Sequence, residues 1–362
     1  MRHWGQKYRT GGIVFMLGVI AMSGMLFCNT WNTLRAEEHK DDSAEITHHF
    51  SRYSHSSKQT LNFQAFDKLL QKIVWDTGPS NRLYAFRPWI SKAEGSSRIV
   101  QGNKNPTRLE GNRIFYHILT DNNLNEIEDL LLGLQEFPRN KPLSSLNRDE
   151  QLAYWLNLHN LAVISLVAQN YHIPNLKELY RKSAEQKSLN VDSIALSLND
   201  VKYQILAPIW KDTAIIYGLF YGAVGGPNIN KRAFYGRDVH DQLRNNGTEF
   251  VNSLRGIRFR KNTLLVSPLY EWNYSQFNFT NIPLMTHLQS YAKGEVADRL
   301  PTYSQMQYAK FDWYIADLFN GKRPEALRPN AMPPLVAQLI ENVLARNLER
   351  KATVEIEEYV DD

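Results

Sequence analysis

The chain of 362 residues contains a single cysteine, Cys28, which lies inside an N-terminal apolar segment. The rest of the chain therefore has no disulfide, no thiol nucleophile and no cysteine ligand for a metal. The sequence also lacks the Gly-x-Ser-x-Gly elbow and the His-Glu-x-x-His zinc helix of common hydrolases. The glycine-rich stretch "GAVGGPNINKRAF" has neither the Gly-Lys-Ser/Thr ending of a phosphate-binding loop nor the GxGxxG pattern of a dinucleotide-binding loop. We therefore interpret it as a tight turn. We expect no cofactor and no metal.

A strong charge of either sign is absent as well. The formal net charge is +5, and the basic residues are scattered instead of forming a stripe that would fit nucleic acid. The basic residues form one local cluster, Arg255, Arg258, Arg260 and Lys261. A solvent-exposed hairpin explains this cluster as well as nucleic-acid binding does. Hydrophobic residues make up 43% of the chain, which is enough to fill one large core or two modest ones. We therefore expect a globular protein that binds no nucleic acid.

Residues 10–34 carry no charge at all, and the basic residues before them are Arg2, Lys7 and Arg9. This asymmetry keeps the N-terminus in the cytoplasm and exports the rest of the chain. Two interpretations remain open, a cleaved signal peptide over residues 1–35 and an uncleaved anchor over residues 11–28. We expect an exported, periplasmic or extracytoplasmic protein, with the inner membrane as a partner if the segment stays uncleaved.

The remaining composition predicts one folded domain. Residues 36–59 are polar and predict a flexible linker, residues 60–350 a single globular domain, and residues 351–362 an acidic tail. The apolar run Ala214–Tyr221 predicts a buried strand, and the sequence around Arg260 to Thr263 predicts a β-hairpin. Helical periodicity dominates elsewhere, so we expect a predominantly helical α+β fold with a small β-sheet.

A buried central helix is predicted at about residues 149–170. Asn147 can accept the free amide of Glu150 while the Glu150 side chain reaches back, as in a capping box. The chain is then apolar almost all round from Leu152 to Ala168, which is typical of a helix buried on every side. Pro174 prevents its continuation. We expect the other helices and the small sheet to pack around this element.

Three polar residues fall inside this helix. At 100° per residue Asn157 and Asn160 share one face, whereas His159 points to the opposite side with Trp155. A buried amide without a partner costs about 1–3 kcal/mol, so we expect the two asparagines to clamp the backbone of a neighbouring loop. A substrate-binding role is the alternative. We interpret His159 as a core histidine and not as a base.

Four segments, in order, resemble the domain of unknown function 547 family. Its members typically show "R-x-E-Q-x-A-F-W-I-N-x-Y-N", then "S-L-x-D-I-E-H-x-I-L-R", "C-G-x-x-S-C-P" and "Y-D-W". This chain has "RDEQLAYWLNLHN", "LSLNDVKYQIL", "YGLFYGAVGGP" and "FDW" in the corresponding places. The resemblance covers roughly Phe63 to Asn320, and its first motif is the specific one.

The departures from the family pattern fall on residues that could carry chemistry. Lys202 and Tyr203 stand where the family has Glu-His, and Ile216 stands where its strand has a histidine. Tyr221 and Gly226 stand where it has two cysteines. A thiolate–imidazole pair needs both groups, and this chain supplies neither. The resemblance thus implies a degenerate member, a pseudoenzyme.

We therefore weigh two functions of different class. The first is an exported, non-catalytic cell-envelope domain that binds an unknown envelope protein or a small ligand. The second is an envelope hydrolase or transferase with a non-cysteine site, assembled from Asp312, Asp200, His172, His240, Tyr203 or Ser267. No catalytic residue is assigned, and the candidate pocket or structural polar residues are Asn157, Asn160, His159, Tyr203, Tyr217, Tyr221, Gly226 and Asp312.

Overall fold

The computed structural model of the chain describes residues 44–85, 103–322 and 336–348. The chain separates into two compact units, Met1–His49 and Phe50–Asp362. In the first unit only residues 44–49 are described, and they are helical. Among the described residues no helix is both long and apolar enough to cross a bilayer. The predicted segment 11–28 lies outside the described residues.

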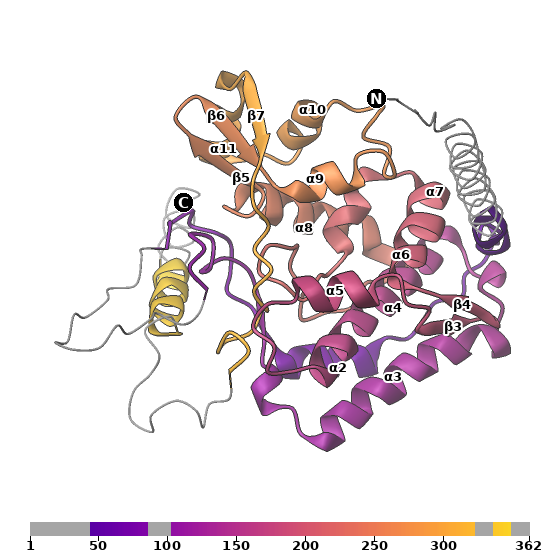
Figure 1. The fold of residues 1–362 in the computed structure, drawn as a ribbon. Coiled ribbons are helices and arrows are strands. Elements are labelled where there is room, and N and C mark those ends of the chain that lie inside the picture. The colour runs from indigo at the N-terminus through magenta and orange to yellow at the C-terminus, as the bar shows by residue number, and fades with distance from the viewer. Residues whose placement is uncertain (1–43, 86–102, 323–335, 349–362) are drawn as a thin grey trace, which may run out of the picture. The chain divides into compact units, whose positions relative to one another are not determined.

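The second unit is predominantly helical α+β, as the sequence predicts (Figure 1). Its longer helices are α2 (Gln64–Ile73), α3 (Asp121–Asn140), α4 (Arg148–Gln169), α5 (Lys177–Ser183) and α8 (Val239–Asn252). The shorter ones are α6 (Leu198–Asp200), α7 (Ala207–Trp210), α9 (Pro268–Asn273), α10 (Leu284–Gln289) and α11 (Gly294–Arg299). The 3-10 turns are η1 (Tyr116–Ile118), η2 (Leu143–Ser145), η4 (Thr213–Gly218), η5 (Gly236–Asp238) and η6 (Leu300–Thr302). A π-helix, η3 (Val201–Leu206), joins α6 to α7, and residues 336–348 are also helical.

Within the described part of the chain the strands form three small sheets. Two are antiparallel pairs, β1 (Val74–Trp75) with β2 (Arg113–Ile114) and β3 (Leu189–Val191) with β4 (Ile194–Leu196). The third has the order β5-β6-β7, with bounds β5 (Ile257–Arg260), β6 (Thr263–Val266) and β7 (Gln305–Tyr308). The predicted hairpin is confirmed as β5 and β6, whereas the parallel pairing of β7 with β6 was not expected.

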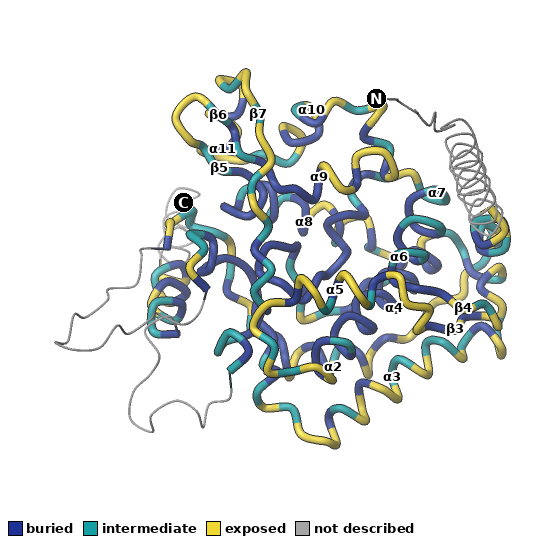
Figure 2. Tube along the Cα trace, in the orientation of Figure 1, coloured by how far each residue is buried: buried dark blue, intermediate teal, exposed yellow. Residues whose placement is uncertain are grey.

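Helix α4 is the predicted central helix, and it is buried on all sides (Figure 2). Asn147 caps it, since the Asn147 Oδ1 atom accepts the amide of Glu150 at 2.9 Å. The second half of the predicted capping box is wrong, because the Glu150 carboxylate accepts the amide of Leu61 instead, at 2.9 Å. The end of the predicted linker also meets this helix start, where Gln151 donates to the Arg52 carbonyl. The first turn of α4 therefore anchors the chain that precedes α2.

The prediction of a buried strand over Ala214–Tyr221 is wrong, because the first part of this run forms the 3-10 turn η4. The run is apolar because it packs between two helices. A Cβ atom at Gly218 would lie 2.6 Å from Leu243 of α8 and 2.9 Å from Leu156 of α4. A short run that is buried on every side has no period that separates strand from helix.

Ser197 caps the helical segment that leads to Pro208. The Ser197 hydroxyl accepts the amide of Asp200, whose carboxylate accepts the amide of Ser197. The segment does not stop before Pro208, because the π-helix η3 carries it into α7. Pro208 then lies in the first turn of α7, where a missing N–H costs nothing.

Extended residues near the C-terminal end of the domain complete the arrangement. Single bridges pair Tyr314 with Asn175 and Ile315 with Ala223. They bring the "FDW" motif beside the glycine-rich turn. That turn is tight, as predicted, because Gly222 has a φ of 71° and Gly226 donates to the Ala223 carbonyl at 3.1 Å.

Candidate functional site

Four of the five positions at which the resemblance expects reactive groups, 202, 203, 221 and 226, lie close together in space. Lys202 and Tyr203 lie on η3, and the Lys202 amine is 4.7 Å from the centre of the Tyr203 ring. The same amine is 5.4 Å from the Tyr221 ring. Gly226 adjoins this ring, since a Cβ atom there would lie 3.2 Å from the Tyr221 Cβ. The segments that correspond to the second and third family motifs therefore lie next to each other.

The Lys202 side chain is enclosed by three tyrosine rings, which we call the tyrosine box: Tyr180, Tyr203 and Tyr221. The amine donates to the Tyr180 hydroxyl at 3.2 Å, and the rings of Tyr180 and Tyr221 stack at 5.4 Å. Ring faces attract a cation, but burial removes its water. Burial lowers the pKa of Lys202 to about 7. Nothing in the sequence signals this, because lysine is rarely buried.

His159 lies beside the tyrosine box as a neutral core histidine. Its Nδ1 atom is 3.1 Å from the Oδ1 atom of Asn160, and its Nε2 atom has no partner among the described residues. Burial and the nearby charge of Lys202 lower the pKa of His159 to about 3. The expected separation of His159 from the asparagine pair is wrong in this detail, because consecutive residues of a helix can still hydrogen-bond through their side chains.

Three further rings cover the box on one side. Trp313 lies 5.6 Å from Tyr180, and Phe311 lies 6.0 Å from Tyr221. Trp272 of α9 stacks on Trp313 at 5.8 Å and is 38% exposed. Trp272 therefore brings the aromatic cluster to the surface, while the Lys202 side chain stays buried.

Asn157 and Asn160 clamp neighbouring backbone, as predicted. Asn157 donates to the Phe234 carbonyl at 2.8 Å and accepts the Phe234 amide at 2.9 Å. Asn160 donates to the Gly218 carbonyl at 2.8 Å and accepts the Phe220 amide at 2.9 Å. Each side chain bonds the backbone through both its amide nitrogen and its carbonyl oxygen, so the two residues hold two loops against α4.

Tyr217 and Asp312 lie outside the tyrosine box. The Tyr217 hydroxyl is 2.7 Å from the Nε2 atom of His287, and burial raises the pKa of Tyr217. Asp312 accepts from the amide group of Asn103 at 2.7 Å and from the Tyr314 backbone at 3.2 Å. Burial raises the pKa of Asp312 as well. These contacts give both residues a packing role in the folded domain.

The other groups considered for an enzyme have structural contacts of their own. Asp200 caps a helix, and the exposed His240 lies 3.1 Å from Asp149. Ser267 caps α9 and lines a small pocket together with Asp312. The exposed His172 has a φ of 84°. Among the described residues no three carboxylate, imidazole or thiol side chains lie close enough to hold a metal ion.

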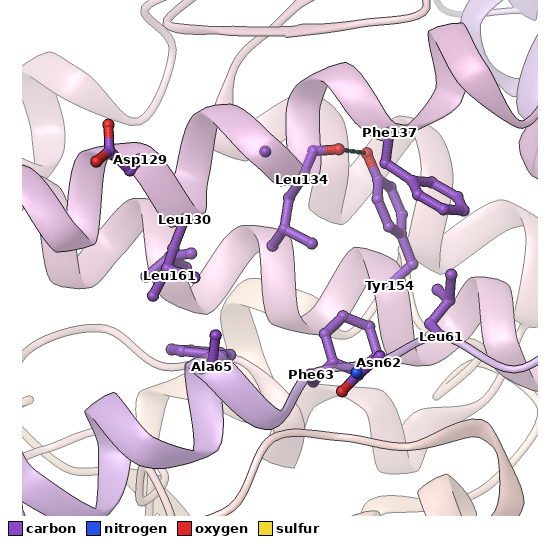
Figure 3. A pocket seen from close by; sticks show the side chains of 12 residues that line it. Leu61, Asn62, Phe63, Ala65, Asp129, Leu130, Leu134, Phe137, Tyr154 and Leu161 are labelled. Carbon is purple, nitrogen blue, oxygen red and sulfur yellow. Dashed lines mark hydrogen bonds between the residues drawn. The ribbon is translucent and has the colours of Figure 1, made fainter.

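An open pocket of about 350 Å³ lies between α2, α3 and α4 (Figure 3). We call it the apolar pocket. Its residues are mainly hydrophobic, and they are Leu61, Asn62, Phe63, Ala65, Phe66, Asp129, Leu130, Gly133, Leu134, Phe137, Tyr154 and Leu161. The only hydroxyl, that of Tyr154, is already used, because it donates to the Leu134 carbonyl at 2.8 Å. The sequence did not single out this pocket.

The pocket exists because α3 buries little of its apolar stripe. In 20 residues this helix buries only Asn123, Ile127 and Pro138. Leu130, Leu134 and Phe137 remain half-buried and face the pocket. Because exposed apolar surface is unfavourable in water, this half-covered stripe is the kind of surface that a ligand stabilises.

The comparisons with known proteins agree with the resemblance. A family model described as "Protein of unknown function, DUF547" matches residues 143–251, which contain α4, η3 and the glycine-rich turn. Comparison with curated proteins and with solved structures gives no match. The chain is therefore similar to the DUF547 family over residues 143–251.

Proposed function

We propose that this chain is an exported, non-catalytic domain of the cell envelope that binds a small apolar ligand in the apolar pocket. The observation that carries the proposal is the composition of that pocket. Its one ionisable side chain apart from a hydrogen-bonded tyrosine is Asp129, which is exposed on α3. A concave, largely hydrophobic site without converging ionisable groups supports binding and offers no general acid, base or nucleophile.

The tyrosine box supports the non-catalytic part of the proposal. Tyr221 occupies a position where the family has a cysteine, and burial raises the pKa of its phenol well above the usual value. A protonated phenol is a poor nucleophile at neutral pH. Gly226 has no side chain, and His159 is too weak a base to activate a neighbour because its pKa is about 3. No residue pair there can replace a thiolate and an imidazole.

Export rests on the sequence, with basic residues before residue 10 and none in residues 10–34. An alkaline-phosphatase fusion after Arg35 should be active in cells, and a cytoplasmic reporter fused at the same point should be silent. The reverse pattern would overturn export. The mass of the mature protein then decides between cleavage within residues 1–35 and an anchor at residues 11–28.

Ligand binding is tested with N-phenyl-1-naphthylamine, an uncharged probe that fluoresces in apolar sites. Gly133 lies on α3 at the pocket, and a Cβ atom added there meets nothing within 4 Å. Gly133→Phe should therefore fold and fill the pocket, whereas Gly133→Ala should leave it open. We expect the probe to bind wild type and Gly133→Ala, and to bind Gly133→Phe at least tenfold more weakly. Equal binding to all three proteins would contradict the proposal.

An envelope hydrolase or transferase is the second candidate, and one observation favours it. A Lys202 amine with a pKa of about 7 is neutral in much of the population, and a neutral amine is a nucleophile. Incubation with activated esters, followed by intact-mass measurement, distinguishes the two functions. We expect adducts on exposed lysines only. A stoichiometric adduct that disappears in Lys202→Met or in Tyr221→Phe would favour the enzyme.

A further inference from the structure

A second, polar pocket adjoins the apolar one. It has a volume of about 380 Å³, and its residues are Thr60, Leu61, Asn62, Gln64, Asp67, Glu150, Tyr235 and Arg237. Two residues, Leu61 and Asn62, line both pockets. Helix α4 contributes Glu150 to the polar pocket and, one turn later, Tyr154 to the apolar pocket. The two pockets therefore lie on either side of the short segment that leads into α2.

The polar pocket contains two carboxylates and one guanidinium group. Glu150 is only 4% exposed, and its Oε2 atom accepts the Leu61 amide at 2.9 Å. Asp67 accepts the Tyr235 hydroxyl and the Ala233 amide, each at 2.6 Å. The exposed Arg237 lies over the Tyr235 ring at 4.8 Å. Acceptors thus outnumber cations in the polar pocket.

We propose that the ligand is a single-chain amphiphile, with its alkyl chain in the apolar pocket and a head group that donates hydrogen bonds and carries no negative charge in the polar pocket. The inference rests on the proposed ligand-binding function and names the class of ligand. The apolar pocket matches the chain because its lining is hydrophobic and its volume is at the small end of ligand sites, roughly 300–1,000 Å³. An anionic head would have to approach Glu150 and Asp67, which repel it.

Glu150 is the residue that should sense the head group. Burial raises its pKa, so a cationic head that approaches it favours the ionised form. Binding of an amine should therefore weaken as the pH falls and Glu150 becomes protonated. A purely hydrophobic site would show no such pH dependence.

The test uses full-length protein and three ten-carbon probes that differ only in the head group: decylamine, decanol and decanoate. Each displaces N-phenyl-1-naphthylamine below its micelle concentration. We expect decylamine to bind at least tenfold more tightly than decanoate, with decanol between them. Glu150→Gln keeps an oxygen for the Leu61 amide and should reduce the preference for the amine to threefold or less. Arg237→Gln should increase the preference.

Matched variants separate the two proposals. Gly133→Phe on α3 and Ala65→Trp on α2 both fill the apolar pocket and should weaken all three probes. Leu132→Phe is the control, because Leu132 is 52% exposed and does not line the pocket. If decanoate binds as tightly as decylamine and the filling variants still abolish binding, the head-group inference is wrong and the proposed function stands. If the naphthylamine probe does not bind wild type, both the proposed function and the head-group inference are wrong.

Discussion

The side-chain amine of Lys202 lies 3.2 Å from the hydroxyl oxygen of Tyr180 and 5.3 Å from the centre of the same ring. Lys202 is 2% exposed, so this hydrogen bond and the surrounding ring faces take the place of the water that an ammonium group normally binds. Removing that water disfavours the charged form more than the rings favour it, since the pKa falls to about 7. The position where the family carries an acidic residue therefore holds an amine that can give up its charge near neutral pH.

The stability of the protein should rise with pH above neutrality because of Lys202. Between pH 7 and the ordinary lysine value of 10.5 the unfolded chain binds a proton that the folded chain does not, so the free energy of unfolding increases with pH. Lys202→Met should reduce this slope by up to about 1.4 kcal/mol per pH unit. Urea unfolding between pH 7 and 9 measures it. Lys187→Met is the control, because the Lys187 side chain is 50% exposed. Equal slopes in Lys202→Met and wild type would mean that Lys202 stays charged in the fold.

Acid should destabilise the protein through His159. The folded chain holds this imidazole neutral down to a pH of about 3, whereas in the unfolded chain it binds a proton below about 6.5. The free energy of unfolding therefore falls as the pH decreases from 6.5 towards 3. His159→Leu should reduce this loss, whereas the exposed His240→Leu should not. Thermal melts at pH 7 and pH 5 compare the variants, and an unchanged difference in melting temperature for His159→Leu would contradict the assignment.

Each asparagine of the clamp should be required for stability. Asn157→Ala leaves the amide and the carbonyl of Phe234 without partners, and each buried group without a partner costs about 1–3 kcal/mol. Asn160→Ala should have a similar effect on Gly218 and Phe220. Urea unfolding should show losses of at least about 2 kcal/mol. Asn170→Ala, at the exposed end of α4, is the control and should change little. If stability stays the same while probe binding is lost, the asparagines belong to a binding site.

Two glycines should respond to alanine in opposite directions. Gly133 is a helical residue with open space around a new Cβ atom, so Gly133→Ala should stabilise the protein by up to about 1 kcal/mol. Gly225→Ala should destabilise it, because the new Cβ atom would lie 2.6 Å from the backbone nitrogen of Asp312. Melting temperatures of the two variants measure the contrast. A loss of stability in Gly133→Ala would show that the wall of the apolar pocket is packed more tightly than the structure indicates.

The parts of the fold that follow from the sequence are those with local signals. Helix α4 was predictable because its cap residue Asn147 and its apolar run both lie within one segment. The role of Asn157 and Asn160 was predictable because a buried amide without hydrogen-bond partners costs free energy. Which groups are the partners was not predictable, because they lie far along the chain. Strand β7 gave no signal, because it is exposed and polar and pairs on one edge only.

The candidate site was predictable only in part. The resemblance indicated positions 202, 203, 216, 221 and 226, and the structure brings 202, 203, 221 and 226 together. It could not indicate that a lysine is buried among tyrosines, because that depends on Tyr180 from another helix. The sequence could not predict the apolar pocket, for a similar reason. The stripe Leu130, Leu131 and Leu134 predicts a helix, but how far the stripe is covered depends on how α2 and α4 pack against it.

The two asparagine clamps have a consequence for the order in which the molecule assembles. The bond from Asn160 to Phe220 spans 60 residues, and the bond from Asn157 to Phe234 spans 77. Neither loop can gain these bonds until α4 has formed and a long stretch of chain has closed on it, which is entropically costly and slow. Once made, the bonds join both loops and the helix into one cooperative unit. The amides of Phe220 and Phe234 should therefore exchange with solvent only when the whole domain unfolds.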